Sequence, residues 1–122
     1  MHDTLRSRRI LVVEDEYFLA DDLLRALRAE GAEVVGPVSS RHEARSLIND
    51  QLDGAILDIK LQDGEVYDIA DDLSRMHVPF AFATGYDAEI IPYRFQTAAR
   101  VEKPYEARAA VKVIERFFSA RA

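Results

Sequence analysis

The sequence predicts an α/β protein with a doubly wound parallel sheet that carries helices on both faces. Short apolar runs alternate along the chain with longer stretches of helical periodicity, and no internal repeat or linker interrupts them. The short runs are apolar at consecutive positions, which is typical of parallel strands buried on both faces. Strict alternation of strands and helices then favours one parallel sheet between two helical layers.

Five short segments are predicted to be strands. The first is rich in β-branched residues, and the third is apolar until its last residue, Asp58. The fourth begins with Pro79, at the one position where a strand loses no ladder donor to proline. The predicted strands span residues 9–14, 33–38, 54–58, 79–84 and 100–102.

Helices are predicted between these strands. Apolar residues recur at helical spacing after the first strand, and Gly31 then supplies a stop signal. Ser39 or Ser40 is suited to cap the second helix. Between residues 87 and 99 the pattern is ambiguous, because Pro92 suits the first turn of a short helix but would break one that began at Ala88. The predicted helices span residues 16–30, 41–48 and 66–76, with a last helix through 111–118.

Composition limits the classes of protein to consider. With 122 residues and a hydrophobic fraction of 48%, the chain can bury the core of a single domain. It has no cysteine, which excludes disulfides and thiolate zinc sites. No apolar run approaches the roughly 20 residues that cross a bilayer, so we expect a cytoplasmic protein without a membrane partner. A net charge of −6 disfavours binding to nucleic acid.

Polar residues break the apolar runs at the ends of four predicted strands. Glu14 and Asp15 follow the first, Asp58 ends the third, Thr84 ends the fourth and Lys103 follows the fifth. In an open α/β sheet, ligands bind beyond the carboxyl ends of the strands. Each residue alone has an ordinary structural explanation, such as a helix N-terminus or a turn. Their joint occurrence at successive strand ends indicates a site.

The residue types at these strand ends indicate a metal and a phosphoryl group. Three carboxylates brought together repel one another unless protons or a cation intervene. Mg²⁺ prefers one or two carboxylates together with waters and a phosphate. Lys103 would add a positive charge for a phosphoryl oxygen, and Thr84 a hydroxyl donor. The sequence therefore predicts a divalent metal, Mg²⁺ or Mn²⁺, beside a phosphoryl site.

In its motifs the chain resembles the receiver domains of two-component response regulators. The matching segments are residues 10–16, 57–64, 83–85 and 102–105. Residues 79–86 also resemble a subgroup of single-domain regulators with a Phe-Ala-Thr-Gly signature (the FAT GUY subgroup), best known in alphaproteobacteria. The resemblance implies the flavodoxin-like (βα)₅ receiver fold with strand order 2-1-3-4-5.

This resemblance also implies a role for each matching residue. Asp58 would attack a phosphohistidine on a partner and become an aspartyl phosphate. Thr84 and Lys103 would hold the phosphoryl oxygens. The implied metal ligands are Glu14, directly or through water, Asp15, Asp58 and the backbone carbonyl of Lys60.

The expected protein is a single receiver domain over residues 1–122 with no output domain, a phosphoacceptor rather than a turnover enzyme. Its partners would be a sensor histidine kinase or phosphotransfer protein and a downstream protein bound through the fourth helix, fifth strand and fifth helix. It would signal by altered protein–protein contact or serve as a phosphate shuttle or sink. Two positions depart from the family pattern: Glu14 stands where many receivers have Asp, and Arg100 replaces an aromatic switch residue.

Three alternatives remain less favoured. An aspartate-nucleophile phosphatase would place a second Asp where Lys60 stands. A flavin-binding module would need a phosphate loop after its first strand, where Glu14 and Asp15 would repel the phosphate. An unphosphorylated adaptor derived from a receiver would have lost Asp58 or Lys103, and both are present.

Overall fold

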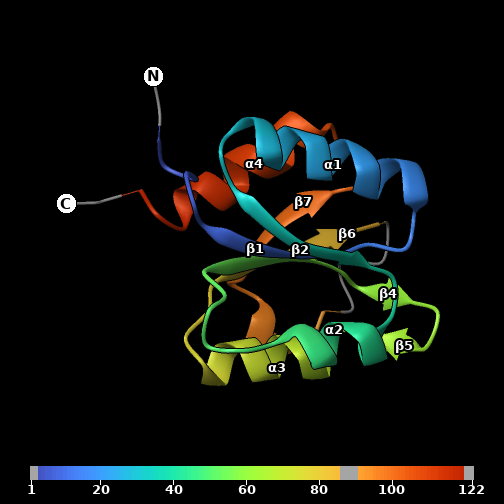
Figure 1. Cartoon of the computed structure of the whole chain (residues 1–122). Coiled ribbons are helices and arrows are strands. Elements are labelled where there is room, and N and C mark those ends of the chain that lie inside the picture. Colours follow the sequence, from blue (N-terminus) through green and yellow to red (C-terminus); the bar gives the residue numbers. More distant parts are fainter. Residues whose placement is uncertain (1–2, 86–90, 120–122) are drawn as a thin grey trace.

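A central sheet lies between two layers of helices in the structure, a computed structural model that describes residues 3–85 and 91–119 (Figure 1). The five-stranded sheet is parallel throughout, in the order β2-β1-β3-β6-β7. Because β6 and β7 are the fourth and fifth strands of this sheet along the chain, the predicted order 2-1-3-4-5 is confirmed. The strands are β1 (Arg9–Val13), β2 (Glu33–Val38), β3 (Gly54–Asp58), β6 (Phe80–Thr84) and β7 (Ala99–Glu102).

Two helices cover each face of the sheet. Figure 1 shows α1 (Tyr17–Ala29) and α4 (Ala107–Arg116) on one face, and α2 (Arg41–Leu47) and α3 (Tyr67–Arg75) on the other. Ser40 caps α2, because its hydroxyl accepts a hydrogen bond from the Glu43 N–H at 3.1 Å. Among the described residues, no helix combines the length and the apolar character needed to span a membrane.

Apolar side chains from β1 and β3 contribute to both layers between the sheet and the helices, joined by Phe82 of β6 in one layer and Val101 of β7 in the other. On the α2–α3 face an aromatic cluster surrounds Phe82, which is fully buried. Its ring lies 5.9 Å from that of Tyr67, 5.2 Å from Phe80 and 5.3 Å from Phe95, all edge-to-face. Burying a side chain of this size contributes about 1.5–3 kcal/mol. These contacts fix β6, and with it Thr84 at its carboxyl end.

A short hairpin with two residues in each strand follows β3. The sequence patterns did not predict it. Its strands, β4 (Lys60–Leu61) and β5 (Gly64–Glu65), pair antiparallel. Asp63 at the turn accepts hydrogen bonds from the backbone N–H groups of Arg41 at 2.8 Å and His42 at 3.1 Å. The hairpin is therefore held against the first turn of α2, and it fixes the backbone that leaves Asp58.

The segment before β7 differs from the expected fourth helix. Its described part, residues 91–98, holds one turn of 3-10 helix, η2 (Tyr93–Phe95), and no α-helix. Pro92 is the N-cap residue of this turn and not its first helical residue. Phe95 is only 5% exposed in the aromatic cluster, so a short turn buries the apolar residue that the segment offers. The partner surface predicted on a fourth helix therefore has no helical basis in residues 91–98.

Candidate active site

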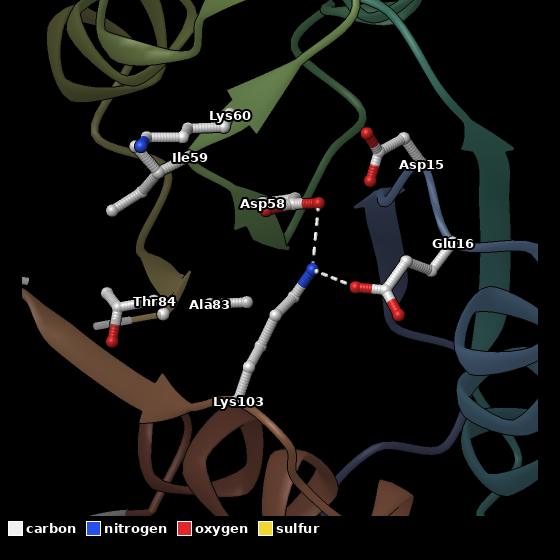
Figure 2. A pocket seen from close by; sticks show the side chains of 9 residues that line it. Asp15, Glu16, Asp58, Ile59, Lys60, Ala83, Thr84 and Lys103 are labelled. Atoms are coloured by element: carbon white, nitrogen blue, oxygen red, sulfur yellow. Dashed lines mark hydrogen bonds and ion pairs between the residues drawn. The ribbon is translucent and has the colours of Figure 1, made fainter. Parts of the chain in front are cut away.

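A cavity of about 340 Å³ opens where the carboxyl ends of β1, β3, β6 and β7 meet (Figure 2). Parallel strands present their carboxyl ends at one edge of the sheet, which is why side chains far apart in the sequence converge there. The structure brings together every residue that the sequence nominated, and Glu14, which is buried and does not line the cavity, contacts Lys103. The cavity is lined by Asp15, Glu16, Asp58, Ile59, Lys60, Ala83, Thr84, Gly85 and Lys103.

The amine of Lys103 lies at the centre of the charged groups. Its Nζ donates to Asp58 Oδ2 at 3.0 Å, to Glu14 Oε2 at 3.1 Å and to Glu16 Oε2 at 2.9 Å. The side chains of Glu14 and Asp58 are only 2% and 7% exposed, whereas that of Glu16 is 62% exposed. The backbone of Lys103 is fixed as well, because its N–H donates to the carbonyl of Thr84 at 2.6 Å.

The carboxyl groups of Asp58 and Asp15 both have raised pKa values in this site. Burial raises the pKa of Asp58, and the charge of Glu14 raises it further, against the opposing effects of Asp15 and Lys103. Burial, a hydrogen bond with Asp58 and the Asp58 charge together raise the pKa of Asp15 to about 6. A hard divalent cation relieves such repulsion by accepting the carboxylate oxygens directly.

Glu14 is fully engaged by neighbours within the protein. Its Oε2 also accepts the backbone N–H of Glu16 at 3.1 Å, and its Oε1 accepts the hydroxyl of Tyr105 at 3.4 Å. Burial raises the pKa of Tyr105, and the nearby Glu14 charge adds to the effect. Burial alone would lower the pKa of Lys103, but its hydrogen bonds to Glu16 and Asp58 outweigh burial and raise it. The lysine is therefore charged throughout the physiological range.

Thr84 contributes a hydroxyl with no partner in the described part of the chain. The residue is 1% exposed, and its Oγ1 is a buried atom without a hydrogen bond. Figure 2 shows this hydroxyl directed away from Asp58, although Thr84 lines the same cavity. A buried hydroxyl without a hydrogen bond is unfavourable. An incoming acceptor in the cavity would relieve this cost after one side-chain rotation.

The acidic residues after β1 suit a metal ion. One carboxylate oxygen from each of Glu14, Asp15 and Glu16 lies within 4.8 Å of the others. Lys60, the implied carbonyl ligand, begins β4 at the rim of the cavity. The position of its backbone is set by the hairpin. Oxygen donors of this kind are those that Mg²⁺ and Mn²⁺ prefer.

Sequence reasoning missed two members of this site. Glu16 bonds Lys103 as closely as Asp58 does, and Tyr105 reaches Glu14. Both signals were present in the sequence, since Glu16 extends the acidic run after β1 and Tyr105 follows the Lys-Pro pair. Neither signal says which way a side chain points, and that depends on the packing of α1 and of the loop after β7.

Comparison with known proteins decides the family. No family model matches the sequence. The receiver domain of HemR from Leptospira biflexa is 26% identical with a TM-score of 0.80, covering 95% of this chain and 98% of that one. SdrG from Pseudomonas melonis Fr1, solved in a BeF3-activated conformation, is 31% identical with a TM-score of 0.71, covering 88% of this chain and 95% of SdrG. This chain belongs to the response regulator receiver family.

A curated relative agrees with this assignment to the receivers. The transcriptional regulatory protein PdtaR of Mycobacterium tuberculosis is 29% identical over 118 residues, which cover 93% of this receiver and 58% of PdtaR. The receiver spans about half the length of the curated relatives that it matches. Their similarity to this chain therefore bears on the receiver part alone.

Proposed function

We propose that this receiver accepts a phosphoryl group on Asp58 from a phosphohistidine, in a reaction that depends on Mg²⁺ or Mn²⁺. The observation that carries the proposal is the buried Asp58 carboxylate held 3.0 Å from the Lys103 amine at the rim of a solvent-open cavity. A buried carboxylate beside a fixed cation, with room in front of it, is placed to act as a nucleophile. The unpartnered Thr84 hydroxyl adds a donor for the group that arrives.

The transfer forms one bond and breaks another. A carboxylate oxygen of Asp58 attacks phosphorus while the P–N bond of the phosphohistidine breaks. The bonding electrons leave with the imidazole nitrogen, which takes a proton from solvent. Lys103 is charged throughout and neutralises the phosphoryl oxygens without moving a proton, and Thr84 donates a hydrogen bond to one of them. Positioning and charge stabilisation are the protein's contribution, as in other phosphoryl transfers.

The acidic residues fit a divalent metal. The ligands we propose are Asp15, Asp58, the carbonyl of Lys60 and, directly or through water, Glu14. A bound Mg²⁺ would neutralise the carboxylates and the phosphoryl oxygens between them. Burial, and after it the hydrogen bond and charge of Asp58, raise the pKa of Asp15 to about 6, and a cation would favour the charged form of both carboxyl groups.

The phosphorylated form would act through contact with another protein. We place this contact on η2, β7 and α4, where Tyr93 is 91% exposed. Arg100 of β7 donates to the carbonyls of Phe95 at 3.3 Å and Gln96 at 3.0 Å, so the residue at the usual aromatic position holds η2. The Phe-Ala-Thr-Gly segment before residue 86 supports membership of the FAT GUY subgroup.

In this proposal the chain is a phosphoacceptor rather than a turnover enzyme, and its donor is a histidine kinase or phosphotransfer protein. The test is intact-mass measurement after incubation with acetyl phosphate, with and without Mg²⁺, beside Asp58→Asn. The expected result is a gain of one phosphoryl group that requires the metal and is absent in the variant. If the wild-type protein gains no mass from acetyl phosphate or from a cognate kinase, the proposal is wrong.

A further inference from the structure

We infer that a groove between α1 and α4 is the interface of a weak twofold dimer of this chain, in which the α4 helices of two copies pack antiparallel. Figure 1 shows both helices on the same face of the sheet. The groove has a volume of about 350 Å³ and shares no lining residue with the cavity around Asp58. It is lined by Ala26, Ala29, Glu30, Arg108, Val111, Lys112 and Glu115.

The charged side chains of this groove have no partners in the described part of the chain. Arg108 and Lys112 bring positive charges to it, and Glu30 and Glu115 bring negative ones. None of the four side chains makes a hydrogen bond or an ion pair with a described residue. On the opposite face of the sheet, by contrast, the arginines of α2 and α3 pair with aspartates. A groove that holds unpaired charges of both signs is complementary in charge to a copy of itself.

Three of these charges stand at the unfavourable end of their helix. Arg108 lies in the first turn of α4 and Glu115 in its last turn, and Glu30 is the C-cap residue of α1. The helix dipole favours anions at the N-terminal end and cations at the C-terminal end. Each placement therefore opposes folding of the single chain slightly, and an opposite charge from outside would relieve it.

An antiparallel second copy of α4 would supply these opposite charges. Glu115 follows Arg108 by seven residues, so the two lie about two turns apart on one side of the helix. A twofold axis that passes midway between them, near Val111 and Lys112, brings Arg108 of each copy opposite Glu115 of the other. Glu30 lies at the same end of the groove as Glu115, because α1 and α4 both run back from the carboxyl edge of the sheet.

The mixed charge of the groove favours a second copy over another kind of partner. An acidic partner would meet Glu30 and Glu115, and a basic partner would meet Arg108 and Lys112, whereas a copy related by a twofold axis pairs both signs. Ala26 and Ala29 are small enough to let a second helix approach closely. The net charge of −6 on each copy repels the other at long range, so the dimer should be weak and form only at high protein concentration.

The test is sedimentation equilibrium over a concentration series for wild-type protein, Arg108→Glu, Glu115→Arg, an equimolar mixture of these two variants, and the double variant. Wild-type protein should form dimers as its concentration rises. Each single variant should reduce the association constant about tenfold, because twofold symmetry introduces every like-charge contact twice. The mixture and the double variant should both associate more strongly than either single variant, because opposite charges again face each other.

Arg28→Glu is the matched control for the change in net charge. Arg28 is an exposed cation of α1 without a described partner, and it does not line the groove. Its reversal should weaken association distinctly less than Arg108→Glu does. Recovery of dimers in the mixture also shows that both single variants are folded.

Three results would overturn the inference. One is a wild-type protein that stays monomeric up to millimolar concentration, and another is a dimer that Arg108→Glu and Arg28→Glu weaken equally. The third is a mixture that associates no better than the single variants, which would exclude the antiparallel pairing. Phosphoryl uptake from acetyl phosphate should be the same in Arg108→Glu and wild type, so the dimer and the proposed function are tested independently.

Discussion

Replacing Asp58 with Asn should stabilise the metal-free protein at neutral pH. Asn keeps the size of the side chain but removes one negative charge from a group that Glu14 and Asp15 already crowd. Lys103 keeps two carboxylate partners, Glu14 and Glu16, after the change. The repulsion lost is therefore larger than the attraction lost, and the free energy of unfolding should rise.

The magnitude follows from the pKa of Asp15, which is raised from 3.8 to about 6. Because one pKa unit corresponds to about 1.4 kcal/mol, the full change is an upper limit of about 3 kcal/mol. Burial is the largest cause and does not depend on Asp58, and Asp15 is exposed to solvent that screens the interaction. We therefore expect Asp58→Asn to stabilise the protein by about 1 kcal/mol.

The effect of pH on the free energy of unfolding follows from the raised pKa of Asp15. An acid whose pKa is raised in the folded state binds more protons when folded, so its contribution to stability is present below pH 3.8 and is lost as the pH rises through about 6. Between these values the wild-type protein should lose stability from Asp15, and Asp58→Asn should retain the part of it that depends on the Asp58 carboxylate. Added Mg²⁺ should stabilise the wild-type protein more at pH 7.5 than at pH 5.

The assay is urea denaturation in EDTA, followed by circular dichroism at pH 4, 5, 6 and 7, with Mg²⁺ added in a parallel series. The gain from Asp58→Asn should grow with pH and disappear when Mg²⁺ saturates the wild-type protein. A variant that is less stable than wild type at pH 7 without metal would show that the Lys103–Asp58 ion pair outweighs the repulsion, and would refute the reasoning.

Three further substitutions separate folding from function. Thr84→Val removes a buried hydroxyl that has no partner among the described residues, so the free energy of unfolding should stay level or rise by about 1 kcal/mol, whereas phosphoryl uptake from acetyl phosphate, measured by intact mass, should fall. Asp63→Ala removes the carboxylate that accepts two backbone N–H groups in the first turn of α2 and should cost about 1 kcal/mol in urea denaturation; no loss of stability would mean that Ser40 caps the helix alone. Phe82→Ala should cost about 3–5 kcal/mol, because the side chain is fully buried in the aromatic cluster, and a thermal melt close to that of wild type would contradict that assignment.

The sequence predicted the sheet well because its strands obey a simple rule. A strand buried on both faces has to be apolar at consecutive positions, and β1 and β3 have this pattern. The strand-end residues were predictable for the same reason, since parallel strands bring their carboxyl ends to one edge. Neither prediction needed knowledge of how side chains pack.

Two features escaped sequence reasoning because they depend on contacts between distant segments. The hairpin after β3 has strands of only two residues, and its Asp63 binds backbone N–H groups of α2 that lie 22 and 21 residues away in the sequence. The turn η2 forms in the segment whose sequence pattern was ambiguous, and Phe95 there completes a cluster with rings from α3 and β6. Local periodicity carries no information about either contact.

The residues that oppose folding are themselves an argument for function. A protein that needed only to fold would not bury Asp58 beside Glu14, nor leave the hydroxyl of Thr84 without a hydrogen bond. Such features persist in otherwise well-packed proteins where a site requires them. Asp58, Glu14 and Thr84 all lie at the carboxyl edge of the sheet. A cation bound at this edge would balance the carboxylate charges, and a phosphoryl group would accept a hydrogen bond from the Thr84 hydroxyl. One bound state would therefore remove both unfavourable contributions to folding.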